Sequence, residues 1–421
     1  MSHSSPTPAE LRVREVPWEA LAGVGPLLDA PLAEVLSGAP AERVLDRLLR
    51  RTPGLARAVR AAVAEAVFGV GLWRRRLQWQ VQDADAPPRV LLAALVRDLG
   101  GRADAAALVG LAASLPPPRA PPEALAVRCS LPDWLAEELA CCQGIDATAL
   151  ADALNRPGPI CLRANPARTT RADLAALLAQ EGIAADPAPL AAHGLVVRPA
   201  GSHRPNLYGS AAWREGAFEL QDEASQLVGG LLGRPGERVL DACAGAGGKT
   251  LQLAAAVGEG GCVHACDPDL GRLGRLRARA ERAGVAGRVR VEGARPPPGL
   301  QVDAALVDAP CSELGTLRRG PDLRWRLDPA AFDALPGLQL GLLDAAARCV
   351  RPGGRLVYAT CTFRAEEDEA VALAFERGNP GFRRVAPAAA SAVVTPEGFV
   401  RTWPQVHGTD AFFAAVWDQV A

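Results

Sequence analysis

Two cysteines and an aspartate lie at the ends of apolar strands that the pattern predicts in the second half of the chain. Asp308-Ala309-Pro310-Cys311 follows one such strand, and Thr360-Cys361 ends the neighbouring one. A lone cysteine at a strand end is most often an inert small hydrophobic residue. Two thiols beside a carboxylate at one edge of a sheet instead indicate nucleophilic catalysis, because a thiolate is a strong nucleophile.

The chemistry that suits this group is methyl transfer to a carbon such as C5 of cytosine. That carbon is a poor nucleophile until a thiolate adds to the neighbouring C6, and the resulting enamine can take a methyl group. The C5 proton must then leave, and the thiol must be expelled. One cysteine can perform the addition, and another close to it can assist the release.

A loop of small residues follows a further predicted strand, which ends at Asp241. The loop runs into a predicted helix and consists of Ala242, Cys243, Ala244, Gly245, Ala246, Gly247, Gly248, Lys249 and Thr250. Its backbone N–H groups can approach an anionic group at the helix N-terminus. The phosphate-binding P-loop pattern G-x4-G-K-[ST] fails, because it needs glycine where Cys243 stands.

Asp267 ends the next predicted strand, where a carboxylate can accept hydrogen bonds from the hydroxyls of a ribose or cap the following helix. The loop and this aspartate favour a nucleoside cofactor, without distinguishing a dinucleotide from S-adenosylmethionine. Lys249 is the only lysine among 46 lysines and arginines. A compact ammonium differs from a planar guanidinium, so this position can require lysine, although chance explains a single residue equally well.

The composition is that of an ordinary globular protein. Its 421 residues suggest about three domains, and the net charge of −1 gives no overall attraction to nucleic acid. No run of 18 apolar residues exists, and the first ten residues lack a basic segment followed by an apolar core. We therefore expect a cytoplasmic protein without membrane contacts. The ten cysteines include no C-x2-C pair, so no metal site is expected.

The elements that position these residues fall into three predicted domains. Residues 1–120 show helical periodicity, and five prolines between residues 115 and 125 mark a linker. Residues 126–210 alternate helices and short strands and end in a Gly/Pro/Asn-rich stretch near 201–209. Residues 211–421 alternate strands and helices regularly, which predicts a doubly wound, mostly parallel α/β sheet with its ligands beyond the carboxyl ends of the strands.

The chain resembles the Sun/Nop2 family of RNA cytosine-C5 methyltransferases over roughly residues 126 to 421. The blocks that carry the resemblance are QDEASQ from Gln221, DACAGAGGKT, DAPCSELGTLRRGPDLRW, RPGGRLVYATCT and HGTDAFF. The helical front is similar to the NusB-like RNA-binding domain of the bacterial 16S rRNA enzyme. The resemblance implies a Rossmann-like class I methyltransferase domain with a seven-stranded sheet, preceded by an RRM-like module. It also implies S-adenosylmethionine as the cofactor and RNA as the substrate, and small-subunit rRNA is the RNA that it favours. The protein would be a monomer.

The resemblance implies a role for each matched residue. Cys361 would be the nucleophile, Cys311 would assist release, and Asp308 would contact the target base and the cofactor side. The loop from Cys243 to Lys249 would hold the methionine part of the cofactor, with Lys249 also beside the cytosine, and Asp267 would hold its ribose. DNA cytosine-C5 methyltransferases use the Pro-Cys thiol as nucleophile instead, and they would not explain Thr360-Cys361.

The chain departs from the family pattern at three places. Ala246 replaces a proline of the loop, Ala411 replaces a glycine of the last block, and Gly293 replaces the aspartate expected to bind adenine. Either Glu292 substitutes for that aspartate, or backbone and apolar contacts hold the adenine. The altered pocket around Gly293 leaves open a non-catalytic RNA-binding ribosome assembly factor. A tRNA cytosine-C5 methyltransferase also stays open, because the surfaces that recognise the RNA are not motif-like.

Local arginine clusters are the candidates for RNA contacts. A solvated arginine-rich surface explains the largest of them, seven arginines between residues 271 and 290, equally well. Trp325 can stack on a base or belong to the core. The clusters are Arg74, Arg75 and Arg76; Arg272, Arg275, Arg277, Arg279, Arg282, Arg288 and Arg290; and Arg318, Arg319, Arg324 and Arg326.

Overall fold

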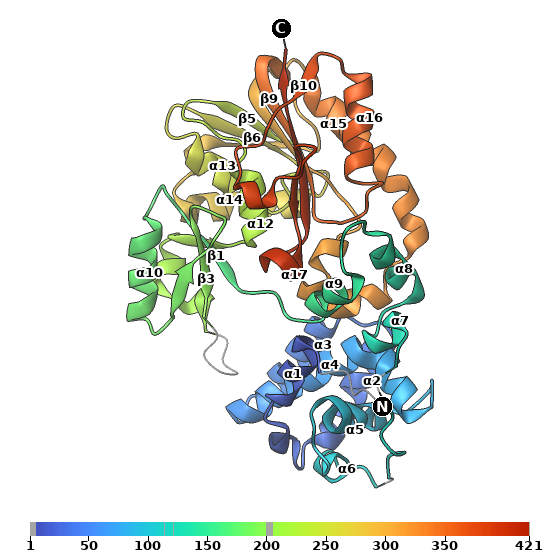
Figure 1. The fold of residues 1–421 in the computed structure, drawn as a ribbon. Helices are drawn as coiled ribbons and strands as arrows, with labels where there is room; N and C mark the ends of the chain where they lie inside the picture. Colours follow the sequence, from blue (N-terminus) through green and yellow to red (C-terminus); the bar gives the residue numbers. More distant parts are fainter. Residues whose placement is uncertain (1–5, 113, 121, 199–204, 421) are drawn as a thin grey trace. The chain divides into compact units, whose positions relative to one another are not determined.

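The computed structural model describes residues 6–112, 114–120, 122–198 and 205–420, so part of the predicted boundary at 201–209 lies outside the described residues. The chain forms two compact units (Figure 1). Unit 1 contains the described residues up to Pro157 together with Leu317–Pro329, and unit 2 contains the rest. Residues 126–157, which the sequence analysis placed in the small module, therefore belong to the helical unit. The division into three domains stays a prediction.

Unit 1 is helical, as predicted for the front of the chain. The long helix α4 carries buried residues at three- and four-residue spacing, such as Ala62, Val63, Ala66 and Val70, and packs against α2, α3 and α5. Its helices are α1 (Pro8–Arg14), α2 (Asp29–Leu36), α3 (Ala41–Arg51), α4 (Arg57–Val81), α5 (Pro88–Ala94), α6 (Ala105–Leu108), α7 (Leu125–Arg128), α8 (Asp133–Cys141) and α9 (Ala147–Leu154).

The segment Leu317–Pro329 belongs to unit 1 although it follows Cys311 closely in the sequence. The Asp322 carboxylate accepts a hydrogen bond from the N–H of Ala41 at the start of α3 (3.3 Å). The indole N–H of Trp325 donates to the carbonyl of Gly71 in α4 (2.8 Å). These contacts hold the short helix Pro321–Trp325 against the helices of the same unit.

Unit 2 begins with a small antiparallel sheet in the order β2-β3-β1-β4. Leu162, Leu174, Leu195 and Phe218 are buried between this sheet and its helix α10. Strands β2 and β4 have three residues each and were not predicted, because such short runs show no periodicity. The elements are β1 (Cys161–Ala164), α10 (Arg171–Gln180), β2 (Ala185–Pro187), β3 (Gly194–Val197), α11 (Ala211–Arg214) and β4 (Phe218–Leu220).

The larger sheet of unit 2 has the strand order β10-β12-β9-β8-β5-β6-β7, with β11 paired to β12 beside this path. Strands β7, β6, β5, β8 and β9 are parallel, and β12 and β10 are antiparallel to their neighbours. The elements are α12 (Glu223–Gly229), β5 (Arg238–Asp241), α13 (Gly248–Ala256), β6 (Cys262–Cys266), α14 (Leu270–Ala283), β7 (Val289–Gly293), β8 (Val302–Asp308), α15 (Leu335–Ala347), β9 (Val350–Thr360), α16 (Glu369–Gly378), β10 (Phe382–Arg384), β11 (Val400–Thr402), α17 (Pro404–His407) and β12 (Phe412–Gln419).

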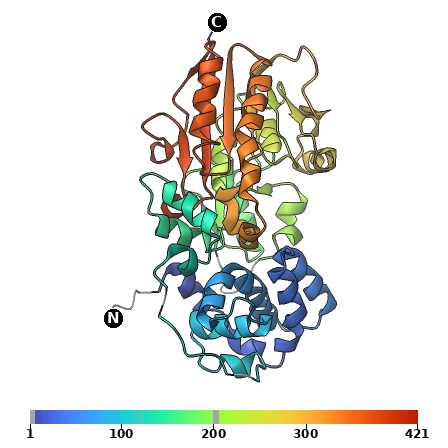
Figure 2. The same ribbon diagram turned by 90° about the vertical axis from the view of Figure 1, so that its right-hand side faces the viewer.

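Both faces of this sheet are buried, which confirms the predicted doubly wound arrangement. Along β9, Leu356 and Tyr358 belong to one apolar core, and Val357 and Ala359 belong to the other. Helices α13 and α14 pack into the second core, and α15 and α16 lie side by side over the first (Figure 2).

The strand order reverses at β5, which is the topological switch point of the sheet. Strands β6 and β7 follow on one side of β5, and β8 and β9 follow on the other. Ligands of doubly wound sheets bind at the carboxyl ends of the strands at such a switch point. The loop after β5 and the residues after β8 therefore meet at the edge where the candidate site was predicted.

Candidate active site

The two predicted catalytic thiols meet beyond the ends of β8 and β9. The Sγ atoms of Cys311 and Cys361 are 3.4 Å apart. The loops that carry them are joined through the backbone, because the N–H of Gly315 donates to the carbonyl of Cys361 (3.0 Å). Both cysteines are partly exposed, so a substrate can reach the pair.

The surroundings of Cys361 favour its protonated form. The hydrogen bond with Cys311 is the largest cause, and burial adds to it, so the pKa of the Cys361 thiol lies well above its ordinary value. The negative charges of Asp308 and Glu313 act in the same direction. These surroundings favour the thiol form of Cys361, and a thiol must lose its proton before its sulfur can act as a nucleophile.

Lys249 and Asp308 form an ion pair at the switch point. The ammonium of Lys249 lies 2.7 Å from Oδ2 of Asp308 and 5.1 Å from the centre of the Phe412 ring. Lys249 is buried, whereas the side chain of Asp308 is partly exposed. The ion pair thus fixes the carboxylate at the end of β8 and leaves one of its edges accessible.

The small-residue loop adopts a conformation that requires glycine at two positions. Gly245 and Gly247 have φ of 56° and 93°, and a Cβ on Gly247 would lie 2.2 Å from a Leu276 methyl carbon. The Asp267 carboxylate accepts hydrogen bonds from the N–H groups of Gly245 and Asp269, each at 2.8 Å. Asp267 therefore fixes the loop. The alternative role as cap of the following helix belongs to Asp269 instead, and the contact of Asp267 with a ribose stays a prediction.

The other loop residues are anchored to the sheet and to helices. The N–H of Ala244 donates to the carbonyl of Cys266 (2.8 Å), and the carbonyl of Ala246 accepts a hydrogen bond from Arg279 (2.5 Å). The carbonyl of Gly248 accepts a hydrogen bond from the buried Arg163 (2.8 Å). Burial raises the pKa of Cys243, so this cysteine contributes an uncharged thiol to the loop.

Asp241 leaves an acceptor unused at the start of this loop. Its Oδ2 accepts a hydrogen bond from the hydroxyl of Thr250 (2.7 Å), whereas its buried Oδ1 has no partner in the described part of the chain. Burial raises the pKa of Asp241 to about 6. A buried unpaired carboxylate oxygen at this position suits a cationic ligand.

Glu292 on β7 is paired with His264 on the neighbouring strand β6. Its carboxylate lies 2.7 Å from Nδ1 of His264, and Nε2 of the same imidazole lies 3.3 Å from Sγ of Cys262. Gly293 has a φ of 91°, and its carbonyl accepts a hydrogen bond from the N–H of Asp267 (2.9 Å). The contact of Glu292 or Gly293 with adenine stays a prediction, and His264 competes for the Glu292 carboxylate.

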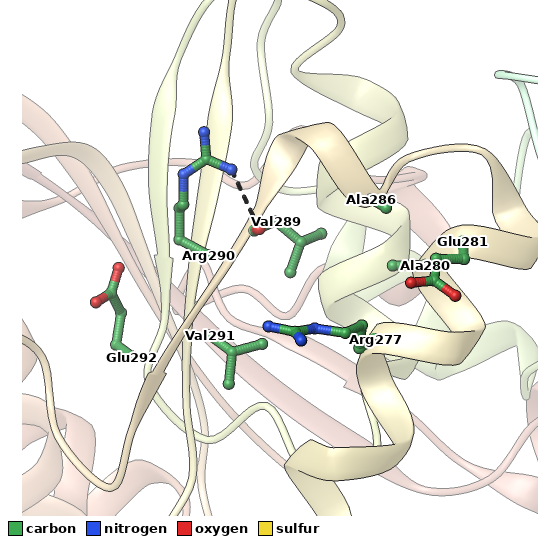
Figure 3. Close-up of a pocket in the computed structure, with 8 residues that line it drawn as sticks. All are labelled: Arg277, Ala280, Glu281, Ala286, Val289, Arg290, Val291 and Glu292. Carbon is green, nitrogen blue, oxygen red and sulfur yellow. Dashed lines mark hydrogen bonds between the residues drawn. The ribbon is translucent and has the colours of Figure 1, made fainter.

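A pocket of about 520 Å³ lies between α14 and the edge strand β7, away from the predicted residues of the glycine loop and the thiols. Figure 3 shows Arg277 and Val291 pointing toward each other across it, and Glu292 turned to the other side of the strand. Its lining includes Glu292, the predicted adenine candidate, and Arg277 and Arg290 of the predicted arginine cluster, but nothing in the sequence indicated that these residues line one pocket.

The structure contradicts part of the predicted RNA contacts. Arg324 is fully buried and donates to Oδ1 of Asn155 (2.7 Å), and Arg76 is buried and paired with Glu10. Neither guanidinium can reach a phosphate, so the prediction is wrong for both. Arg318, from the same cluster as Arg324, is buried as well. Trp325, held by its indole hydrogen bond, packs within unit 1 beneath the guanidinium of Arg74.

The cluster around α14 is only partly available. Arg279 and Arg282 both pair with the buried Glu219. The exposed members of this cluster are Arg272, Arg275, Arg277 and Arg290.

Sequence reasoning missed the polar residues beneath the thiols. Ser312 and Thr362 directly follow Cys311 and Cys361, and their hydroxyl oxygens are 2.7 Å apart. Glu367 is fully buried below them. The sequence did hold a signal for the two hydroxyl residues, because each of the two cysteines is followed directly by one. It held none for Glu367, which stands in an acidic run that is typical of the solvated start of a helix.

In the described part of the chain, no cluster of His, Cys, Asp and Glu has the arrangement of a metal site. No helix among the described residues is long and apolar enough to cross a membrane.

Two segments of the chain match models of one known protein family. Residues 230–418 match the family model described as 16S rRNA methyltransferase RsmB/F, and residues 131–202 match its ferredoxin-like domain. The chain is 36% identical over 299 residues to a probable ribosomal RNA small subunit methyltransferase B of Synechocystis, which covers 68% of this chain and 66% of the relative. It is 32% identical over 277 residues to ribosomal RNA small subunit methyltransferase F of Escherichia coli, covering 62% and 57%. The chain thus spans less than two thirds of the length of each relative.

Solved structures extend the likeness to the fold. The crystal structure of PH0851 has a TM-score of 0.75 at 25% identity and covers 99% of this chain and all of its own. A methyltransferase homologue from Pyrococcus horikoshii has a TM-score of 0.60 at 26% identity, covering 70% of this chain and 98% of its own. The sheet of unit 2 is that of a class I methyltransferase. The chain therefore belongs to the RsmB/F methyltransferases of the Sun/Nop2 family, to which its sequence blocks pointed.

Proposed function

We propose that this chain transfers a methyl group from S-adenosylmethionine to C5 of a cytosine in RNA, through a covalent adduct between Cys361 and C6. The observation that carries the proposal is the pair of thiols, 3.4 Å apart, beyond the ends of two neighbouring parallel strands. The Lys249–Asp308 ion pair lies at the end of one of these strands. A single thiol would suffice for addition, so the second thiol supports a reaction with a separate release step.

The residues at the switch point fit S-adenosylmethionine, which supplies an electrophilic methyl group when bound. The first turn of α13 offers backbone N–H groups to a carboxylate. The unpaired Oδ1 of Asp241 suits the ammonium group of the methionine part. One oxygen of Asp267 accepts a hydrogen bond from the N–H of Gly245 and the other from the N–H of Asp269, and each can accept another from a ribose hydroxyl.

The protein side chains then divide the chemistry between them. Cys361 would release its proton to solvent as Sγ bonds to C6, and the electron pair of the C5–C6 double bond would move to C5, the carbon that takes the methyl group that the cofactor would supply. Asp308, held by Lys249, can accept a hydrogen bond from the amino group of the cytosine. The C5 proton would then pass to Cys311 in its thiolate form, the C5–H electron pair would re-form the C5–C6 double bond, and the S–C6 bond would break with its electrons returning to Cys361, which lies beside Cys311.

Small-subunit rRNA is the substrate that the relatives support, because both are described as ribosomal RNA small subunit methyltransferases. A tRNA substrate uses the same chemistry, so only the product separates the two. The test incubates the protein and labelled S-adenosylmethionine with small-subunit rRNA and, separately, with tRNA, and identifies the methylated nucleoside by mass spectrometry.

The expected product is 5-methylcytidine in the rRNA, formed by the native protein and by Cys141→Ser, an exposed cysteine far from the site in the sequence. Cys361→Ala should form none. Methylation of another atom, or full activity of Cys361→Ala, would contradict the proposal. Calorimetry that detects no binding of the cofactor at millimolar concentration would favour the non-catalytic assembly factor instead.

A further inference from the structure

The two active-site loops are fastened to each other by a buried pair of hydroxyl groups. Ser312 Oγ and Thr362 Oγ1 are 2.7 Å apart, and both side chains are buried. Each is the direct neighbour of one thiol, since Ser312 follows Cys311 and Thr362 follows Cys361. A displacement of either hydroxyl therefore moves a thiol with it.

Glu367 fixes the Pro-Cys side of this arrangement from below. Its Oε2 accepts hydrogen bonds from the N–H of Ser312 and from the amide of Gln339, each at 2.9 Å. The same Gln339 amide donates to the carbonyl of Pro310 (3.0 Å), on the other side of Cys311. The residues before and after Cys311 are thus both held through one fully buried carboxylate.

The carboxylate is itself held in place by the sheet. The hydroxyl of Tyr358 in β9 donates to the backbone carbonyl of Glu367 (2.5 Å). Glu313, next to Ser312, has a φ of 58°, a conformation that a side chain rarely adopts and that the surrounding contacts must maintain. Buried hydrogen bonds of this kind fix the orientation of a loop, because each lost partner leaves a buried polar group unsatisfied.

We infer that Ser312, Thr362 and Glu367 form a clamp that sets the distance between the two thiols and thereby controls release of the methylated RNA. The inference rests on the proposed function and adds positioning residues to it. Addition to C6 and methyl transfer need only Cys361. Release needs Cys311 beside it, so a loosened clamp slows the last step and leaves the earlier ones intact.

The test is Thr362→Val, which replaces the hydroxyl by a methyl group of similar size. In a single turnover, methyl transfer should proceed within about twofold of the native rate. In steady state, kcat should fall at least about fivefold, and a denaturing gel should show a larger fraction of protein bound covalently to RNA. Thr362→Ser keeps the hydroxyl and should restore release, and Thr52→Val, a threonine in unit 1, is the matched control.

Ser312→Ala removes the other hydroxyl and should give the same pattern, so the test does not depend on how well one variant folds. Native kcat without extra adduct in both variants would overturn the clamp, as would a loss of methyl transfer in the single turnover. These results differ from a failure of the proposed function, in which the native protein itself forms no 5-methylcytidine.

Discussion

At the scale of single residues, the site combines two neighbouring thiols with an ion pair between Lys249 and Asp308. The types and strand-end positions of Cys311, Cys361 and Asp308 were readable from the sequence, because parallel strands bring their carboxyl ends to one edge. The hydrogen bond between the thiols, and the high pKa that it gives Cys361, were not readable, since they depend on a loop geometry that no spacing encodes.

The first prediction concerns the protonation of Cys361. Because the hydrogen bond with Cys311 is the largest cause of the raised pKa, Cys311→Ala should lower the pKa of Cys361 and increase its thiolate fraction at neutral pH. Alkylation of Cys361 by iodoacetamide is followed by mass spectrometry from about pH 6.5 upward until the rate levels off, and the pH of the half-maximal rate should be lower in the variant. The midpoint does not depend on accessibility, so an unchanged midpoint would refute this cause.

Lys249→Arg tests whether the single lysine is required. The ammonium is buried between Asp308 and the ring of Phe412, and a guanidinium is larger and binds as a planar fork. We expect kcat to fall at least about tenfold, because this factor corresponds to the free energy of roughly one hydrogen bond to a charged group. The far-ultraviolet circular dichroism should stay unchanged. Full activity would mean that lysine stands here by chance.

At the scale of elements, the regular alternation of helices and strands from residue 221 onward was predicted and is present. Strands β2, β4, β10 and β11 were missed, because three residues give no periodic signal. The buried position of Glu367 was also missed, since the acidic run from Glu366 to Glu369 looks solvated in the sequence. Only the packing of α15 and α16 on the sheet makes that carboxylate an internal group.

Gly315→Ala probes how closely the two loops approach. A Cβ on Gly315 would lie 2.2 Å from the carbonyl oxygen of Ala411 and 2.8 Å from that of Cys361, and neither backbone atom can yield cheaply. We expect a loss of about 1–3 kcal/mol in the free energy of unfolding and a greater than tenfold loss of methylation. The control is Gly341→Ala in α15, where open space receives the methyl group and stability should not fall. Native activity of Gly315→Ala would show that the loops have room to separate.

At the scale of the whole molecule, the chain leaves unit 2 after Thr316 and re-enters it at Ala330, so a segment close to Cys311 in the sequence belongs to the helical unit. In an arginine-rich protein, a cluster of arginines in the sequence did not predict which side chains are free to contact RNA. Arg324, Arg279 and Arg282 hold the protein's own structure. Burial separates Arg324 from solvated arginines such as Arg275, and ion pairs with the buried Glu219 separate Arg279 and Arg282.

Cofactor binding should stabilise the unit that contains the loop after β5. At a concentration of S-adenosylhomocysteine 100 times its Kd, the free energy of unfolding should rise by about 2.7 kcal/mol. Hydrogen exchange should show the added protection in residues 241–250 of unit 2 and none in α4 of unit 1. Protection confined to unit 1, or no stabilisation at saturating ligand, would place the cofactor elsewhere.

The central claim is that Cys361 forms the covalent bond to RNA and that Cys311 breaks it. Its most direct test mixes RNA and S-adenosylmethionine with Cys311→Ala and with Cys361→Ala and separates the products on a denaturing gel. The account predicts a slow-migrating protein–RNA band for Cys311→Ala and no such band for Cys361→Ala. A band for Cys361→Ala, together with normal release of RNA by Cys311→Ala, would reverse the two roles and contradict the account.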